Sequence, residues 1–198
     1  MKITLIYDNK TLRQGLIKDW GFSCFIEGLE KTILFDTGKN GHILLSNMGK
    51  LGIRPEEIDL VFLSHAHKDH TDGLDILLTK NSKMEVWLPE FFPSGFKETI
   101  KAAGATVVDV DNSQKICEGA YTTGVTPGWI KEQSLILDTD KGLIVVTGCA
   151  HPRIVKIIFT VKELLDKSIY MVFGGFHLMK HSNLLQVYLD HYKVVFLQ

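Results

Sequence analysis

Short apolar segments alternate along this chain with longer segments in which apolar residues recur every three or four positions. The first pattern is typical of buried strands, and the second is typical of helices that pack on one face. The segments that we predict to be strands are 2–7, 22–27, 31–35, 60–64, 84–88, 106–110, 114–122, 134–138, 142–147 and 169–173. The predicted helices are 41–51, 72–78, 93–103 and 152–165. Strands grouped around two sets of helices predict an α/β fold with two sheets, each covered by helices on its outer face.

The composition places the chain among globular proteins. Its 198 residues are 45% hydrophobic, which is enough to bury a full core, and we expect a single domain over residues 1–198 or two similar halves packed together. The net charge of -1 gives no electrostatic case for a nucleic-acid partner. No apolar run approaches the roughly 20 residues of a membrane span, and Asp8 interrupts the first strand too early for a signal peptide. We therefore expect a cytoplasmic protein that acts on a small-molecule substrate and needs neither a membrane nor nucleic acid.

The segment from His65 to His70, which reads HAHKDH, is the most informative part of the chain. It follows a buried strand directly and places three imidazoles and one carboxylate within six positions, an HxHxDH motif. His65 and His67 alternate in an extended segment and can point to the same side, while Asp69 and His70 follow as the chain turns toward the next helix. Imidazole nitrogen and carboxylate oxygen suit zinc, with manganese or iron as alternatives. The motif therefore predicts one or two divalent metal ions.

The HxHxDH motif resembles the signature of the metallo-β-lactamase fold hydrolases. Three further segments agree with this resemblance, namely Asp36–Gly38, Gly148–Pro152 and Gly174–Leu178. The last two are similar to segments of the branch that includes an archaeal dihydropterin phosphate synthase of methanopterin biosynthesis. The resemblance implies a four-layer αββα sandwich that spans the whole chain.

The resemblance also implies a ligand set for a first metal ion. His65 and His67 would bind it, and His151, which likewise follows a predicted strand, would be the third ligand. The place of the family's usual third ligand is occupied by Val125, whose side chain cannot bind a metal. Asp36 would support the metal-binding histidines through hydrogen bonds without binding the metal itself.

A second metal ion would be bound by Asp69 and His70, together with His177 or another late ligand. Cys149 stands where the wider family has a bridging aspartate, so it is either a thiolate ligand or a small buried core residue. The family also continues to a last strand that ends in a further histidine, and this chain stops at about that strand. The resemblance thus implies an incomplete C-terminal part, which would weaken the second metal site most.

These features predict a metal-dependent hydrolase. A divalent cation lowers the pKa of a bound water from about 15.7 toward 7 and polarises a carbonyl or phosphoryl oxygen. Asp69 is placed to act as the general base, or it serves as a metal ligand only. Two other functions stay open: a pterin-type transferase that releases diphosphate, and a degenerate metal-binding member without catalysis.

Overall fold

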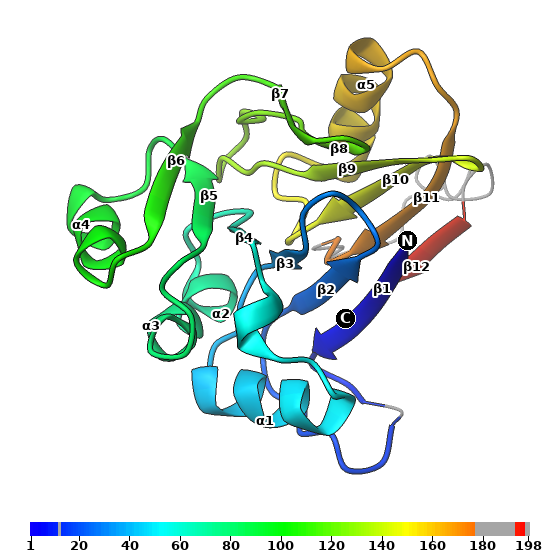
Figure 1. Cartoon of the computed structure of the whole chain (residues 1–198). Helices are drawn as coiled ribbons and strands as arrows, with labels where there is room; N and C mark the ends of the chain where they lie inside the picture. The colour runs from blue at the N-terminus through cyan, green and yellow to red at the C-terminus, as the bar shows by residue number, and fades with distance from the viewer. Residues whose placement is uncertain (12, 177–192, 197–198) are drawn as a thin grey trace. The chain divides into compact units, whose positions relative to one another are not determined.

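The computed structural model describes residues 1–11, 13–176 and 193–196 of the chain. Contacts between residues divide the chain into two compact units, Met1–Val110 and Asp111–Gln198. Among the described residues, the first unit carries one six-stranded sheet with several helices, and the second carries one six-stranded sheet with a single helix (Figure 1). The predicted α/β class with two helix-covered sheets is therefore confirmed, while a single domain over residues 1–198 stays a prediction.

The first unit is built around a sheet in which the strands follow their order in the chain. Strands β1 to β3 are antiparallel and strands β3 to β6 are parallel. The strands are β1 (Lys2–Tyr7), β2 (Ser23–Glu27), β3 (Ile33–Phe35), β4 (Leu60–Phe62), β5 (Glu85–Pro89) and β6 (Thr106–Val110). The helical segments are α1 (Gly41–Leu51), the short 3-10 helix η1 (Pro55–Glu57), α2 (Lys68–Thr71), α3 (Leu74–Leu78) and α4 (Ser94–Ala102).

The core of the first unit lies between the sheet and its helices. Leu34, Val61 and Val86 stand on neighbouring strands and point to the same side, because side chains alternate along a strand. They belong to one buried cluster with Leu44 of α1 and Leu77 of α3, each completely buried. This packing fixes the ends of β3 and β4, where the candidate ligands emerge.

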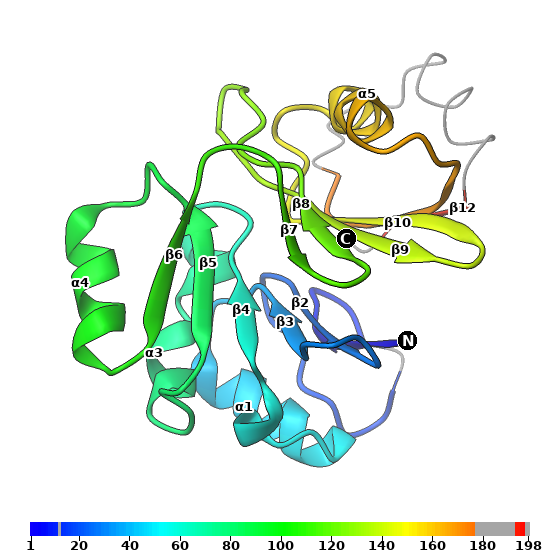
Figure 2. The same cartoon turned by 45° about the horizontal axis from the view of Figure 1, so that its top comes forward.

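The second unit repeats the plan with fewer helices among its described residues. Strands β7 to β10 are antiparallel and strands β10 to β12 are parallel. The elements are β7 (Gln114–Cys117), β8 (Ala120–Thr122), β9 (Leu135–Thr139), β10 (Gly142–Thr147), α5 (Ile154–Leu164), β11 (Ile169–Gly174) and β12 (Lys193–Phe196). Helix α5 packs Ile154, Ile157, Ile158 and Val161 against this sheet (Figure 2).

Two predicted elements are divided differently in the structure. The strand predicted over 114–122 is a hairpin, in which Cys117 pairs with Ala120 across a two-residue turn. The helix predicted over 72–78 is two short helices, and the first of them begins at Lys68. Gly73 lies between them, and its N–H donates to the carbonyl of Gly38 at 3.1 Å rather than within a helix. A Cβ at this position would stand 2.1 Å from the Thr37 carbonyl oxygen.

Within the described part of the chain, every helix is too short or too polar to cross a bilayer.

Candidate metal centre

The carboxyl ends of β3 and β4 carry the predicted metal-binding segments of the first unit. Asp36 follows β3 directly, and its N–H donates to the carbonyl of Phe62, the last residue of β4, at 2.9 Å. Ser64 lies two residues beyond the end of β4. Because the two strands are parallel and paired, Asp36 and the start of the histidine segment leave the sheet side by side.

The buried carboxylate of Asp36 connects Ser64 to His70. One oxygen accepts the backbone N–H of Ser64 at 2.7 Å. The other accepts the Ser64 hydroxyl at 2.7 Å and the Nδ1–H of His70 at 2.6 Å. Because Nδ1 donates to the carboxylate, Nε2 is left as the nitrogen that can bind a cation. The supporting contact expected of Asp36 is present, and it goes to His70.

Full burial raises the pKa of the Asp36 carboxyl, and the nearby His70 and the hydrogen bonds from His70 and Ser64 oppose that shift. The Asp36 backbone has φ 50°, in the left-handed region that aspartate tolerates better than most residues. A carboxylate enclosed in this way requires all its hydrogen-bond donors. Removing the partner of a buried charge lowers the stability of a protein by roughly 3–5 kcal/mol.

His65 and His67 bring two ring nitrogens together. Nε2 of His65 lies 3.1 Å from Nδ1 of His67, and Nδ1 of His65 lies 2.9 Å from the Ser64 hydroxyl oxygen. Two ligands of a tetrahedral zinc ion, each about 2.1 Å from the metal, stand about 3.4 Å apart. The separation of the two nitrogens, which is also a hydrogen-bond distance, is close to that value, so the pair fits a shared cation. His65 is fully buried and His67 is partly exposed, which leaves one side of the pair toward solvent.

Asp69 and His70 lie in the helical turn α2, one turn earlier than predicted. The Asp69 carboxylate stands 3.5 Å from Nε2 of His70, and its side chain is 19% exposed. The His70 carbonyl accepts both the N–H and the hydroxyl of Thr37, at 2.8 and 3.0 Å. The ring centres of His70 and His65 are 4.3 Å apart. The turn is thereby tied to the chain just after β3, and it places the Asp69 carboxylate beside His70.

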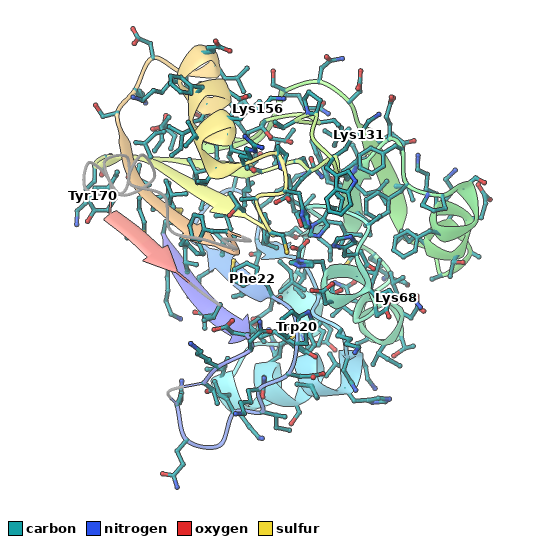
Figure 3. The ribbon with its side chains drawn as sticks, turned by 180° about the vertical axis from the view of Figure 1, so that it is seen from behind. Trp20, Phe22, Lys68, Lys131, Lys156 and Tyr170 are labelled. Carbon is teal, nitrogen blue, oxygen red and sulfur yellow. The ribbon has the colours of Figure 1, made fainter. Side chains whose placement is uncertain are left out.

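The backbone of α2 is also in close contact with Gly21, which is distant in the sequence. Gly21 has φ 129°, and a Cβ at this position would stand 2.1 Å from the Asp69 carbonyl oxygen. The glycine is flanked by the exposed Trp20 and the buried Phe22, both labelled in Figure 3. Nothing in the sequence pattern pointed to Gly21, because its partner is a backbone atom far away along the chain.

In the second unit, the segment after β10 carries Cys149 and His151. Cys149 is buried and His151 is partly exposed. Between them, Ala150 has φ 53°, a conformation that residues with a side chain rarely adopt. The side chain of Glu132 accepts hydrogen bonds from the backbone of this segment, and we did not predict that role.

The structure therefore brings all five predicted site residues of the first unit into one cluster. Its members are Asp36, His65, His67, Asp69 and His70. His151 lies in the second unit, at the carboxyl end of β10. His177 lies outside the described residues.

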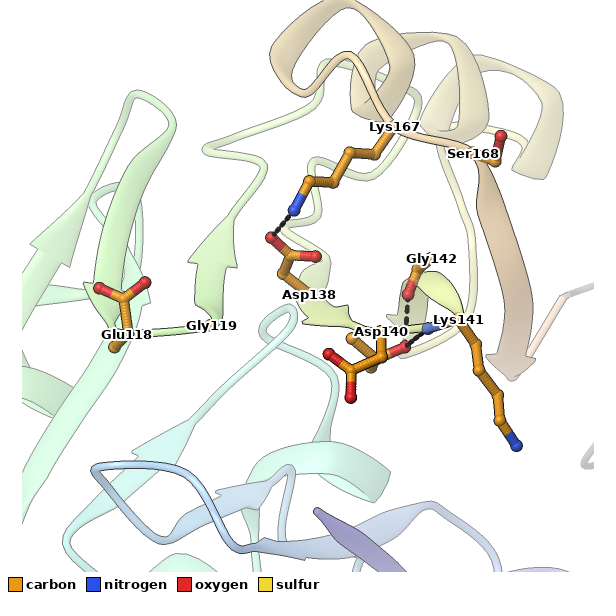
Figure 4. A pocket seen from close by; sticks show the side chains of 9 residues that line it. Glu118, Gly119, Asp138, Asp140, Lys141, Gly142, Lys167 and Ser168 are labelled. Atoms are coloured by element: carbon orange, nitrogen blue, oxygen red, sulfur yellow. Dashed lines mark hydrogen bonds and ion pairs between the residues drawn. The ribbon is translucent and has the colours of Figure 1, made fainter.

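A surface pocket of the second unit lies at the other end of β10, beside the β9–β10 turn (Figure 4). Carboxylates and ammonium groups both line it, and Lys167 forms an ion pair with Asp138 there. The pocket is adjacent to the amino end of β10, whereas the segment with His151 follows the carboxyl end. It is therefore not part of the candidate metal centre.

Comparisons with known proteins agree with these features. A family model described as a beta-lactamase superfamily domain matches residues 31–128, which include the HxHxDH motif. The chain is 32% identical to a 7,8-dihydropterin-6-methyl-4-(beta-D-ribofuranosyl)-aminobenzene-5'-phosphate synthase from Methanocaldococcus jannaschii, over 82% of this chain and 72% of that protein.

Two solved structures have the same fold. A metal-dependent hydrolase of the beta-lactamase superfamily is 27% identical, with a TM-score of 0.75 over 91% of this chain and 78% of that one. A metallo-beta-lactamase fold protein from Bacillus subtilis is 14% identical, with a TM-score of 0.66 over 98% of this chain and 94% of that one. The predicted fold class is confirmed, and the chain belongs to the metallo-β-lactamase superfamily.

Proposed function

We propose that this protein is a metal-dependent hydrolase whose reaction centre contains the HxHxDH segment. The observation that carries the proposal is the convergence of the His65 and His67 ring nitrogens, 3.1 Å apart, beside a buried carboxylate network. His65, His67 and His151 would hold one divalent cation. Asp69 and His70 would hold a second, together with a late ligand such as His177. The nitrogen-rich donor set suits zinc, and manganese or iron are alternatives.

A cation held by these residues supplies Lewis acidity, which lowers the pKa of a coordinated water and polarises a substrate oxygen. Asp69 is the general base of the proposal. Its carboxylate is partly exposed at the edge of the histidine cluster, where it can accept a proton from the attacking water and pass it to the leaving group. The substrate class that fits is a small phosphoester, lactone or amide.

The residues around Asp69 keep the site in one arrangement. Asp36 accepts the Nδ1–H of His70 and thereby fixes the tautomer of that imidazole. Ser64 links the same carboxylate to His65, so one buried group orients two of the candidate ligands. A site held in this way loses little free energy to reorganisation when the substrate binds.

A second function is favoured by the identity to the archaeal synthase. In a transferase of that type, the same residues and cations would hold a diphosphate leaving group while an arylamine attacks, and Asp69 would have no water to deprotonate. The cations would then offset the negative charge of the departing group.

Metal content tests the site. We expect protein purified without chelator to contain one or two equivalents of divalent metal by elemental analysis, and His67→Ala to lose at least one of them. His42→Ala is the matched control, because His42 is an exposed histidine of α1 in the same unit. A wild-type protein without metal, or equal losses in the two variants, contradicts the proposal.

Turnover separates the two functions. Hydrolysis of a phosphodiester or lactone panel by the wild-type protein, with kcat lowered about 10²–10⁴-fold in Asp69→Asn, supports the hydrolase. Diphosphate release that requires an added arylamine supports the transferase instead. Retained metal with turnover in neither assay identifies a degenerate metal-binding member.

A further inference from the structure

The Glu132 carboxylate is enclosed by backbone N–H groups of the second unit. Glu132 is 1% exposed and lies between β8 and β9. One of its oxygens, Oε1, accepts the N–H groups of Gly148 at 2.9 Å, Cys149 at 3.1 Å and Ala150 at 3.1 Å. The other, Oε2, accepts the N–H of His151 at 3.0 Å. A single side chain thus binds four consecutive amides.

Consecutive N–H groups that point to one side form a concave anion site, and here the anion is a side chain of the same protein. Hydrogen bonds to an ionised acceptor are about twice as strong as those between neutral groups. The four amides come directly after β10, and most of this segment is buried. Without the carboxylate they would be buried donors in need of another acceptor.

The bound segment has an unfavourable backbone conformation. Ala150 has φ 53°, and its carbonyl accepts the N–H of Arg153 at 2.8 Å, which closes a tight turn before α5. A strained conformation of this kind persists only when its surroundings hold it. The turn determines where the backbone of His151 lies and therefore the direction in which its imidazole leaves the chain.

The segment that carries Glu132 is itself held in place. The backbones of Thr126 and Glu132 pair with each other at 2.8 and 3.3 Å and close a loop at its base. Lys156 of α5, labelled in Figure 3, donates to the carbonyl of Pro127 at 2.6 Å. The loop is therefore fixed to the helix that follows the His151 turn.

We infer that Glu132 is a positioning residue, whose carboxylate clamps the Gly148–His151 turn and thereby places the His151 imidazole for metal binding. The inference rests on the proposed function, in which His151 is a ligand. Glu132 does not bind the metal, and it acts only through the backbone of the turn.

Amide hydrogen exchange on metal-free protein tests the clamp. In the wild-type protein we expect the four amides to exchange at least about a hundredfold more slowly than those of an open loop. In Glu132→Gln, the Oε2 position becomes an NH2 group that cannot accept the His151 N–H, so exchange in the turn should rise about tenfold or more. Peptides from β10 should be unchanged, and so should the turn in Glu163→Gln, which removes an exposed carboxylate of α5.

Cobalt binding tests the positioning. We expect Glu132→Gln to weaken Co²⁺ binding about 10–100-fold and to alter the visible absorption of the bound ion, as is typical when the support of a ligand is lost. His151→Ala removes the ligand itself and gives the reference for complete loss, and Glu163→Gln should bind like the wild type.

The outcomes distinguish the two proposals. Unprotected amides in the wild-type turn, or unchanged exchange in Glu132→Gln, overturn the clamp. Raised exchange with unaltered cobalt affinity and spectrum overturns the placement of His151. A wild-type protein that binds no cobalt overturns the proposed function, although the exchange result still stands for the clamp. The wild-type exchange measurement decides the clamp even if Glu132→Gln does not fold.

Discussion

Gly21 shows how a residue without functional groups can determine the candidate metal centre. Its backbone lies against the Asp69 carbonyl, in a space that no Cβ can enter, and its φ of 129° is rarely adopted by residues with a side chain. Both the lack of space and the positive φ disfavour any residue other than glycine at this position. A larger residue would have to displace the turn that carries Asp69 and His70.

We therefore expect Gly21→Ala to lower the free energy of unfolding by about 2 kcal/mol or more and to reduce metal content. Gly49→Ala is the matched control, because Gly49 lies in α1 with no atom within 4 Å of the added Cβ. There, alanine should stabilise the protein by about 0.5–1 kcal/mol through its helix propensity. Urea denaturation of the metal-free proteins measures both effects. Equal stability of the two variants would contradict the close approach.

The residues of the candidate site differ in how far the sequence could predict them. The HxHxDH motif was predictable because the candidate ligands are close together in the chain and chemically distinctive. Asp36 was predictable only through the family resemblance. Gly21 and Glu132 were not, because each contacts backbone atoms of a distant segment. Backbone atoms are the same in nearly all residues, so these contacts cannot be inferred from the residue types of that segment.

At the scale of elements, helix α1 is tied to its surroundings by one buried amide. The Nδ2 group of Asn47 donates to the carbonyls of Ile6 in β1 and Ile17 in the following loop, at 2.9 and 2.8 Å. Its Oδ1 accepts the N–H of Ile17 at 2.9 Å. Asn47 is completely buried, so water does not replace these bonds.

Asn47→Ala should therefore lower the free energy of unfolding by about 2–4 kcal/mol, because the buried Ile6 carbonyl and the partly buried backbone groups of Ile17 lose their hydrogen bonds. Lys50→Ala, at an exposed position of the same helix, should stay within about 0.5 kcal/mol of the wild type. Chemical denaturation of both variants checks this. A small effect of Asn47→Ala would mean that the loop after β1 contributes little to stability.

The boundaries of an element were predicted well where its capping residues and its apolar spacing agree with how the element packs. The bounds of α1 match the prediction because Asn40 caps its first turn and its apolar face is regular. The helix predicted over 72–78 differs from the structure because the N–H of Gly73 donates to the Gly38 carbonyl, a tertiary contact that divides the segment into α2 and α3. The pattern over 114–122 predicts one strand rather than a hairpin because the turn occupies only two residues.

At the scale of the whole molecule, metal binding should appear as added stability. A ligand that binds only the folded state at 100 times its Kd adds about 2.7 kcal/mol, which raises the Tm of a protein of this size by about 5–10 °C. We expect zinc to raise the Tm of the chelator-treated wild type by such an amount and to have little effect on His67→Ala. Differential scanning calorimetry measures both, and an equal rise in the variant would place the zinc elsewhere.

The division into two units was harder to predict than the two sheets. The order of strands and helices along the chain predicts two sheets. The boundary between Val110 and Asp111 falls directly between β6 and the start of β7, where no proline- or glycine-rich linker marks it. Composition reveals a boundary only when the connecting chain is long and solvated.

The order of strands has a consequence for how the protein is made. In both sheets the described strands lie in the order of the chain, so each pairs with strands next to it in sequence. Antiparallel hairpins such as the pairing of Cys117 with Ala120 close short loops at little cost in chain entropy, whereas parallel pairs such as Ile33 with Leu60 close longer crossover connections and form more slowly. Each sheet can thus grow at one edge as the polypeptide leaves the ribosome. A nascent chain released as far as Val110 already holds every strand of the first sheet and the whole HxHxDH segment.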